Sequence, residues 1–455
     1  MEAFTRRNSN RLLSQSLFFL ATLSLSAMII TPASAATATW SSEQVLESSI
    51  DGATNIHTAI SEAGTSVVVW DKLVGVDPQH PYGIYQVSAS VHTSNGGWSV
   101  NTPLTGPDAT NAGAVVDPFG TVTVFWTSGG VSYDASSIDG GKNWSSPEII
   151  DDSGYTLVSG VNAQVGPSVG ADKDGNIIVV MTKPRSTSPV SYDAKALVKP
   201  LNGTWSTEAL LTGTGGIGIF GSIRLYVNSD GQALFNSGFS TFRRDPQTQV
   251  KWGTEQTVSV AGLGQIYSAS AGLDAGGNGY FVFRTRYSGA FLSTSTPVTG
   301  WTKPRHVAKF DILGSSLQVT GSSPGYALVY GNDMNTGAVR ATVTADTGAT
   351  WGALTNFGFG DSPFAAGSEN GLYSIGWSSG GTNWDRYTVA SGTGIGTGTA
   401  AWVKKALAGN FAGGSVAVAG SIAGGSAQSV AGWGRMATAI GGGTDIGAAT
   451  GTVAP

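Results

Sequence analysis

The chain has 455 residues, of which 12% are charged, and its formal net charge is −5 at pH 7. It contains 66 glycines and no cysteine, which excludes disulfides, thiolate metal sites, cysteine catalysis and a lipoprotein anchor. The acidic balance argues against binding to nucleic acid or to an anionic membrane through net charge. Abundant glycine and aromatic residues with few charges favour many short strands joined by tight turns.

The N-terminus has the pattern of an export signal. Three arginines precede an apolar run over residues 17–30, and an A-x-A cleavage motif follows at 33–35. The run is shorter than the roughly 20 residues that a membrane-spanning helix needs. We expect residues 1–35 to be a signal peptide, with an uncleaved anchor as the alternative. Residues 36–455 are then a secreted or extracytoplasmic bacterial protein (periplasm, cell wall or extracellular) without a membrane span.

A tryptophan recurs along the rest of the chain just after a turn rich in Gly, Ser or Thr. Its positions are Trp40, Trp98, Trp144, Trp205, Trp252, Trp301, Trp351 and Trp402, and the successive spacings are 58, 46, 61, 47, 49, 50 and 51 residues. A second landmark, a Gly turn that leads into an apolar strand, falls once in each unit, for example at 120–126 and 277–283. A repeat near 50 residues indicates stacked supersecondary units.

Each unit predicts four strands. A small-residue inner strand such as 112–116 is followed by the more aromatic second strand, a third strand such as 131–135, and an outer strand after the Trp. Small side chains suit the centre of a β-propeller, where the blades converge. The fold class is therefore all-β: a single β-propeller of four-stranded blades, with eight blades, or seven as the alternative.

The two ends of the mature chain complement each other. It opens with a lone outer strand at 40–47 and closes with three strands near 415–419, 429–433 and 436–441. We expect the N-terminal outer strand to join the C-terminal blade and to close the ring, which removes the open sheet edges. The Gly-rich end, 413–455, is a flexible tail in the alternative interpretation.

One turn pattern occurs in two good copies. The first is S-x-D-x-G-x-x-W, made by Ser137, Asp139, Gly141 and Trp144. The second is T-x-D-x-G-x-T-W, made by Thr344, Asp346, Gly348 and Trp351. Asp can accept hydrogen bonds from the amides that follow it, Gly supplies a positive φ, and Trp anchors the turn against the sheet. These turns resemble the Asp-box (BNR repeat) of sialidase-like β-propellers, and we expect them to be structural.

The resemblance implies exo-sialidase activity as one possibility. Sialidases bind the substrate carboxylate with three arginines and use a Tyr nucleophile assisted by a Glu, with an Asp as acid/base. The Arg-Ile-Pro motif of the family is absent here, and no glutamate falls in the loops expected on the ligand rim. If the chain is an enzyme, it is a sialidase-type glycoside hydrolase with carboxylates from the rim aspartates Asp71, Asp77, Asp108, Asp311, Asp333, Asp361 and Asp385.

Most arginines of the candidate site fall at or soon after the ends of second strands, near the rim opposite the Asp-box turns, with aromatic residues on the same rim. Arg224 lies instead on an expected inner strand at 222–227, which could bring it near the central axis. Guanidinium groups hold carboxylates in paired hydrogen bonds, and aromatic rings stack on sugars. The candidate ligand-binding residues are Arg185, Arg224, Arg284, Arg286, Arg386, Arg435, Tyr82, Tyr287 and Trp384. In the alternative interpretation these arginines cap loops and solubilise the rim.

No other chemistry is indicated. The four histidines, His57, His80, His92 and His306, are widely spaced, and no metal-ligand pattern is present, so neither a metal nor a cofactor is expected. The sequence therefore predicts a non-catalytic module that binds a glycan or a cell-surface or extracellular protein through its loop rim. The alternatives are a divergent exo-sialidase or other glycoside hydrolase, and a structural surface protein.

Overall fold

The structure is a computed structural model. Residues 36–455 form one compact unit, and the expected signal peptide, residues 1–35, lies outside the described residues. The described ranges are 38–40, 44–50, 53–61, 63–76, 83–93, 96–157, 168–187, 190–211, 217–218, 223–314, 316–369, 372–379, 386–393, 401–409, 416–423, 426–436 and 444–453.

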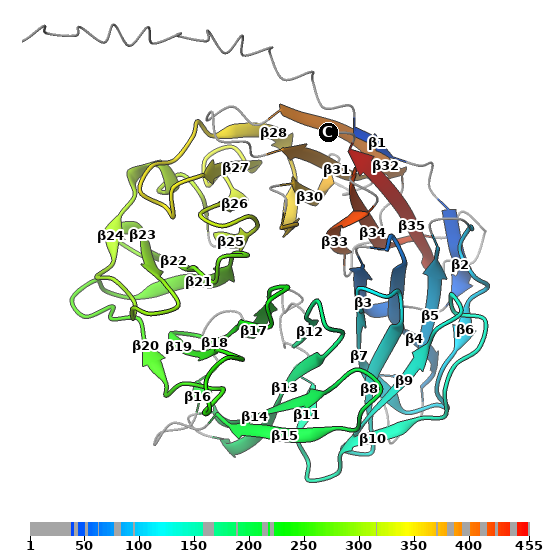
Figure 1. Cartoon of the computed structure of the whole chain (residues 1–455). Helices are drawn as coiled ribbons and strands as arrows, with labels where there is room; N and C mark the ends of the chain where they lie inside the picture. The colour runs from blue at the N-terminus through cyan, green and yellow to red at the C-terminus, as the bar shows by residue number, and fades with distance from the viewer. Residues whose placement is uncertain are drawn as a thin grey trace, which may run out of the picture. The chain divides into compact units, whose positions relative to one another are not determined.

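The described residues form eight antiparallel sheets, which follow one another in chain order (Figure 1). The first sheet is β3 (Ala53–Ile60), β4 (Ser66–Gly75), β5 (Ile84–His92) and β6 (Thr102–Pro103). The second is β7 (Ala109–Val116), β8 (Val122–Ser128), β9 (Val131–Ser137) and β10 (Glu148–Asp151). The third is β11 (Thr156–Leu157), β12 (Val169–Ala171), β13 (Ile177–Thr187), β14 (Val190–Lys199), β15 (Ser206–Leu210) and β16 (Ile217–Gly218).

The next four sheets have four strands each. They are β17 (Ile223–Val227), β18 (Ala233–Ser237), β19 (Ser240–Arg244) and β20 (Gln256–Thr257); then β21 (Ile266–Leu273), β22 (Gly279–Thr285), β23 (Gly289–Ser295) and β24 (Arg305–His306); then β25 (Gln318–Gly321), β26 (Ala327–Asn332), β27 (Ala338–Thr344) and β28 (Thr355–Phe359); then β29 (Asp361–Gly367), β30 (Leu372–Ser379), β31 (Arg386–Thr393) and β32 (Ala401–Gly409).

The eighth sheet combines the two ends of the chain. It contains β33 (Val416–Ala423), β34 (Ser426–Met436) and β35 (Thr444–Val453), and β1 (Ala38–Trp40) and β2 (Gln44–Ile50) both pair with β35. Two sequence predictions need correction here. The expected single strand at 40–47 is two strands, and the expected strand at 436–441 is β35, which begins later because β34 extends to Met436. The Gly-rich end contributes strands to this sheet.

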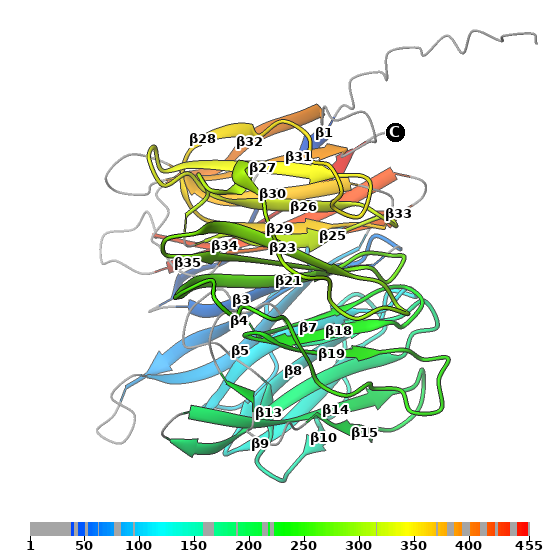
Figure 2. The same cartoon turned by 90° about the vertical axis from the view of Figure 1, so that its left-hand side faces the viewer.

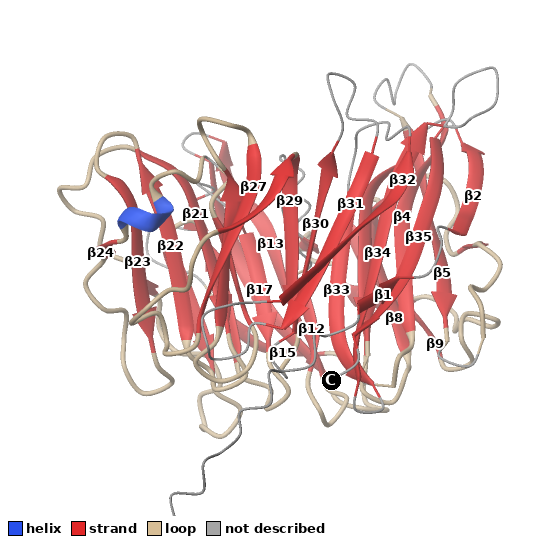
Figure 3. Ribbon diagram, turned by 90° about the horizontal axis from the view of Figure 1, so that it is seen from above, coloured by secondary structure: helices blue, strands red, loops and turns tan. Residues whose placement is uncertain are grey.

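Helix is almost absent from the described residues. The single helical element among them is the 3-10 helix η1 (Ala308–Phe310), which lies beside β23 (Figure 3). The prediction of an all-β fold built mainly of four-stranded antiparallel sheets is therefore confirmed. The expected small-residue strand at 112–116 is part of β7, and the expected third strand at 131–135 is part of β9.

The first strands of neighbouring sheets pack directly against one another, from β3 through β7, β12, β17, β21, β25 and β29 to β33, and β33 in turn contacts β3. Glycine permits the closest of these approaches. A Cβ on Gly272 of β21 would stand 3.2 Å from the Val319 oxygen, and one on Gly367 of β29 would stand 2.3 Å from the Gly321 oxygen. Small residues at these positions are thus required by backbone-to-backbone packing, not by strand formation.

Apolar cores lie between adjacent sheets, whose strands run side by side in Figure 2. The repeat tryptophans contribute to these interfaces. The indole Nε1–H of Trp205 donates to Asp134 on the preceding sheet (3.3 Å), and that of Trp301 donates to Thr241 on the preceding sheet (2.7 Å). Trp351 packs edge-to-face on Phe310, with ring centres 4.9 Å apart. These three repeat tryptophans therefore anchor their units to the preceding part of the fold.

The two predicted Asp turns have the expected hydrogen bonds. The Asp139 carboxylate accepts the amides of Lys142 and Asn143 (3.1 and 3.0 Å), and the Ser137 hydroxyl accepts the amide of Gly141, whose φ is +82°. These bonds, first that from the Asn143 amide, lower the pKa of Asp139 to about 2. The turn at Asp346 repeats the arrangement, with the Thr350 amide and hydroxyl donating to the carboxylate.

We expect Asp346→Ala to lower the free energy of unfolding by about 1–2 kcal/mol, because the Thr344 hydroxyl and the Thr350 amide and hydroxyl all lose an acceptor. Asp152→Ala is the matched control, since Asp152 is an exposed aspartate beyond the end of β10. It should change stability by less than about 0.5 kcal/mol. Denaturant unfolding of both variants measures the difference, and equal losses would contradict a structural role for the turn.

Candidate functional site

An open pocket of about 720 Å³ lies where the sheet of β21–β24 meets the sheet of β25–β28. Its walls come from the β22–β23 loop, the segment between η1 and β25, the β26–β27 loop and the end of β28. In an antiparallel four-stranded unit, these connections all lie at the end opposite the first-to-second and third-to-fourth turns. The lining residues are Tyr267, Arg284, Arg286, Tyr287, Gly314, Ser316, Asn332, Met334, Gly337, Phe359 and Gly360.

Backbone carbonyl groups position Arg284. It lies near the end of β22, and its Nη1 donates to the carbonyl oxygens of Asp311 (2.5 Å) and Leu313 (3.0 Å) in the segment that leads to β25. The Asp311 carboxylate fixes the same segment, because it accepts the Ala290 amide (2.7 Å) and contacts the His306 ring (2.9 Å). One guanidinium nitrogen is thereby held in place at the pocket wall.

Arg286 and Tyr287 extend from the β22–β23 loop. Arg286 stacks over the Tyr287 ring at 5.3 Å from its centre, and both side chains are exposed. Two hydrogen bonds hold the backbone of this loop in place. The Arg286 amide donates to the Gln265 carbonyl, and the Ser288 amide donates to the Thr285 hydroxyl. Among the residues that the structure describes, no carboxylate pairs with the Arg286 guanidinium.

Both walls of the pocket carry exposed apolar side chains, Tyr267 and Tyr287 on the arginine side and Met334 and Phe359 on the opposite side. Met334 and Phe359 are 53% and 52% exposed, while Tyr267 and Tyr287 are 51% and 81% exposed. Four of the fifteen large apolar side chains exposed in the described residues therefore line this one pocket. Gly337, with φ at +65°, makes room for the Phe359 ring, because a Cβ there would stand 2.8 Å from it.

Carboxylates near the pocket are already engaged. Asp311 binds the Ala290 amide and His306, and Asp333 binds Arg340 (2.8 Å) together with the amides of Asn335 and Thr336. The lining set contains no Asp or Glu. Among the described residues, the pocket therefore presents positive charge and aromatic surface, and none of its lining side chains is a carboxylate.

The structure brings three of the nine candidate residues into the pocket: Arg284, Arg286 and Tyr287. Arg185 lies elsewhere, near the end of β13, where it forms an ion pair with Asp193 of β14. Arg386 begins β31 and Arg435 lies in β34, but their side chains are outside the described part of the chain. Tyr82 and Trp384 also fall outside the described residues.

Arg224 occupies a buried position on the inner strand β17. It is 6% exposed, its Nη2 donates to the Gln318 oxygen on β25 (2.7 Å), and its guanidinium lies 5.9 Å from the centre of the Phe364 ring on β29. The Tyr330 hydroxyl donates to the same Gln318 oxygen. Arg224 thus braces inner strands of three sheets and does not line the pocket.

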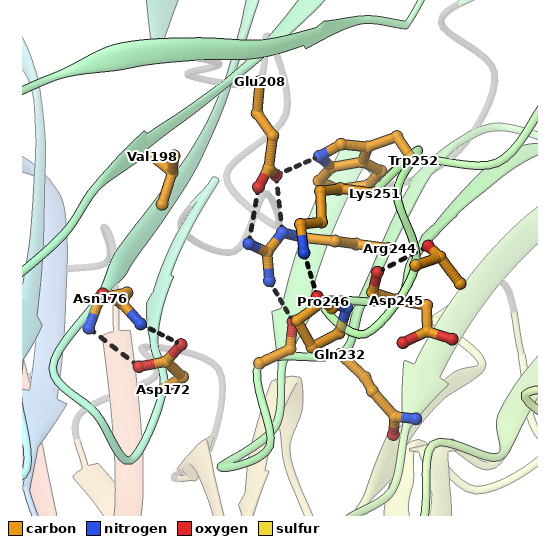
Figure 4. Close-up of polar contacts among 12 residues, drawn as sticks. Asp172, Asn176, Val198, Glu208, Gln232, Arg244, Asp245, Pro246, Lys251 and Trp252 are labelled. Atoms are coloured by element: carbon orange, nitrogen blue, oxygen red, sulfur yellow. Dashed lines mark hydrogen bonds and ion pairs between the residues drawn. The ribbon is translucent and has the colours of Figure 1, made fainter.

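The best-formed arginine–carboxylate pair of the described residues is structural (Figure 4). Arg244 on β19 binds Glu208 on β15 through Nε (2.6 Å) and Nη2 (2.7 Å), and the Trp252 indole donates to the same carboxylate (2.8 Å). Both charged side chains are at most 10% exposed. This cluster joins two neighbouring sheets away from the pocket.

The remaining rim aspartates form no carboxylate pair among the residues that the structure describes. Asp71 is buried and accepts the Asn55 side-chain amide and the backbone amides of Asn111 and Ala112; burial raises its pKa to about 7. Asp77, Asp385 and the side chain of Asp361 lie outside the described residues. Within the described residues, no cluster of His, Asp or Glu has the arrangement of a metal site.

His57 on β3 gives a pH-dependence prediction. Burial lowers its pKa to about 4. As the pH falls, the folded state therefore binds a proton at this histidine at a lower pH than the unfolded state does. The stability that this histidine supports is present above about pH 6.5 and is lost as the pH falls towards 4, by up to about 3 kcal/mol. Asp71, with its raised pKa, acts in the opposite direction over the same range.

The effect of His57 is therefore measured as the difference in unfolding free energy between the His57→Leu variant and the original chain. We expect the unfolding free energy of His57→Leu, relative to the original chain, to rise as the pH is lowered from about 7.5 to 4. A His92→Leu variant should show a smaller rise, because the pKa of His92 is also lowered by burial but by less. Parallel pH profiles for the original chain and His57→Leu would contradict the prediction.

No protein-family model matches the sequence, and no curated protein matches it. Among solved structures, the chain is similar to a protein of unknown function from Dyadobacter fermentans, with 12% identity and a TM-score of 0.41 over 92% of this chain and 99% of that one. It is also similar to the β-propeller domain of the Trilobed protease from Pyrococcus furiosus, with 9% identity and a TM-score of 0.41 over 78% and 97% of the two chains. A Hadza microbial sialidase is 13% identical, with a TM-score of 0.38 over 74% of this chain and 66% of its own.

These similarities are too low to assign a function, so the function is inferred from the residues themselves. The described part of the chain contains no helix of the length and apolar character that crossing a bilayer requires.

Sequence reasoning missed the apolar wall of the pocket. Met334 follows the second strand of its unit, β26, and Arg284 lies near the end of the corresponding strand β22. The sequence prediction for this part of the unit considered only arginine and aromatic residues, so it did not include a methionine. Phe359 ends an outer strand, and its place in the pocket follows from the connection to the next sheet. A search for any large apolar residue in these two loop positions would have found both.

Proposed function

We propose that this chain is an exported recognition protein built on a closed, eight-bladed, sialidase-like β-propeller with Asp-box turns. The leader pattern before residue 36 supports export. Eight sheets, the cyclic contacts of their first strands and the pairing of β1 and β2 with β35 support a closed ring of eight blades. The S-x-D-x-G-x-x-W turns at Ser137 and Thr344 support the family resemblance.

The pocket between the sheets of β21–β24 and β25–β28 is its ligand site. One observation carries this proposal: two guanidinium groups and four exposed apolar side chains line the same pocket, and none of the described lining residues carries a carboxylate. Such a surface attracts an anionic ligand and gains free energy when its apolar groups are covered. The ligand is an anionic glycan or a segment of a cell-surface or extracellular protein, and no cofactor takes part.

The test is binding of anionic probes to the purified chain beginning near residue 36. Oligogalacturonate, sialyllactose and an acidic peptide would be titrated against the original protein, Arg284→Ala and Arg286→Gln. At least one probe should bind, and each variant should weaken it about tenfold, as expected for loss of a charge-assisted contact. If no probe binds the original protein, or if every probe that binds does so equally to all three proteins, this pocket is ruled out as the site.

A divergent glycoside hydrolase is the second candidate, and Tyr155 is the observation that favours it. Burial and the nearby Asp193 charge raise the pKa of its phenol, and Arg185 opposes this rise. The Lys195 ammonium lies 4.5 Å from the ring centre. The phenol has a carboxylate and a guanidinium nearby, as the nucleophile of the family does, and because its pKa is raised its proton would have to pass to a base as it attacks. Hydrolysis of a fluorogenic sialoside that is lost in Tyr155→Phe would establish this alternative, and no turnover beside an active control would remove it.

A further inference from the structure

The pocket offers few polar groups that a ligand could use. The Ser316 hydroxyl donates to the Asn332 side-chain oxygen (2.8 Å) and accepts the Asn332 amide (3.0 Å), and the Asn332 side-chain nitrogen donates to the Gly360 carbonyl. Both polar side chains are therefore engaged with the protein itself. A ligand rich in hydroxyl groups would have to break these bonds or leave its own groups unpaired, which disfavours its binding.

The apolar groups point to a different ligand chemistry. Tyr267, Tyr287, Met334 and Phe359 are each at least half exposed around the pocket. Tyr, Met, Phe and Arg are the residue types enriched at protein–protein interfaces, and Tyr and Arg supply many of the strongest contacts there. Methionine also adapts its shape to apolar side chains, which suits a peptide better than the fixed hydroxyl pattern of a sugar.

The positive charge of the two arginines in the pocket also indicates the charge of the ligand. Arg284 and Arg286 both come from β22 and the loop that follows it, whereas Met334 and Phe359 come from the adjoining sheet. A ligand that fills the pocket must therefore place negative charge and some apolar surface beside the sheet of β21–β24, and apolar groups beside the sheet of β25–β28. The chain has a net charge of −5, so the two guanidinium groups of this pocket favour an acidic partner there by charge complementarity.

We infer that the pocket binds a polypeptide segment in which acidic residues stand beside aromatic or large aliphatic residues. This inference rests on the proposed function and names its ligand. The carboxylates of the segment would form paired bonds with the guanidinium groups, and its apolar side chains would cover Met334 and Phe359. A hydroxyl-rich glycan is the competing occupant.

The experiment uses fluorescence anisotropy with a fluorescein-labelled ten-residue peptide in which Asp and Glu alternate with Phe, Trp and Leu. Two control peptides replace the acidic residues by Lys or the apolar residues by Ser. We expect the first peptide to bind with a dissociation constant in the micromolar range and both control peptides to bind at least tenfold more weakly. Oligogalacturonate and sialyllactose should not displace it.

Matched variants separate the two walls of the pocket. Arg286→Gln and Phe359→Ser should each weaken peptide binding about tenfold, and Arg286→Gln should also reduce its salt dependence. Arg305→Gln and Phe119→Ser are the controls, because both residues are exposed and neither lines the pocket. All four positions are on the surface, so thermal unfolding should be nearly unchanged and serves as the folding check.

The outcomes distinguish the inference from the proposed function. If a glycan binds, Arg286→Gln weakens it and the peptide fails to compete, the pocket is a ligand site but its partner is not a polypeptide. If the peptide binds equally to Phe359→Ser and to the original protein, the apolar wall has no part in recognition and the inference is wrong. If no probe responds to Arg286→Gln, both the inference and the proposed site fail.

Discussion

Gly321→Ala should destabilise the protein strongly, by about 3 kcal/mol. Gly321 ends β25, and a Cβ there would stand 2.2 Å from the carbonyl oxygen of Leu273 and 2.6 Å from the amide nitrogen of Asp274. Both atoms belong to the backbone at the end of β21, so no side-chain rotation can relieve the contact. The two strands must separate, and overpacking of this kind costs about 1–3 kcal/mol or more.

Gly113→Ala is the matched control for this prediction. Gly113 also lies in a first strand, β7, but no atom outside its immediate neighbours stands within 4 Å of the position that its Cβ would take. Alanine there should be neutral or slightly stabilising, because glycine loses more conformational freedom on folding. Guanidinium unfolding midpoints of the two variants make the comparison. Similar losses would mean that strand propensity, and not the close approach of the sheets, selects glycine.

The second large effect is expected at the buried pair of Glu208 and Arg244. Glu208→Leu leaves the Arg244 guanidinium buried without its carboxylate and removes the acceptor of the Trp252 indole. Loss of one partner from a buried pair costs about 3–5 kcal/mol. Arg244→Met should cost a similar amount. The double variant Glu208→Leu/Arg244→Met should recover much of the loss, since no unpaired charge remains.

An exposed ion pair provides the contrast. Lys173 and Asp230 form a 2.6 Å contact between two sheets, but their side chains are 58% and 59% exposed. Lys173→Met should therefore leave the unfolding free energy nearly unchanged, because both charges are screened by solvent. Chemical unfolding of the four variants tests both statements. If the double variant is as unstable as the sum of the single variants, the two residues act independently.

Local sequence patterns predicted the strands well because each strand is bounded by its own turn. The Gly turn before β8 and the Asp139 turn after β9 follow from residue types within a few positions. The end of the chain was predicted less well. Its Gly- and Ala-rich sequence lacks an apolar alternation that would fix the register, so β35 was expected several residues too early.

The candidate site was predicted by side-chain type and only in part. Arg284, Arg286 and Tyr287 reach one pocket because they are neighbours on a single strand and loop. Arg185 and Arg224 share the same residue type but lie in other sheets, where Asp193 and Gln318 engage them. Which distant loops meet is decided by the packing of sheets, and a single sequence does not encode that in any local pattern.

The pairing of β1 with β35 has a consequence for the order of folding. Trp40 lies opposite Gly451, so this ladder joins residues separated by almost the whole length of the chain. Closing so long a loop costs entropy that is recovered only when the ladder forms, and folding rates fall as the mean separation of contacts grows. The first strands to be synthesised are therefore the last to find their partners. Their late docking should appear as the slowest phase of refolding, after the interior sheets have formed.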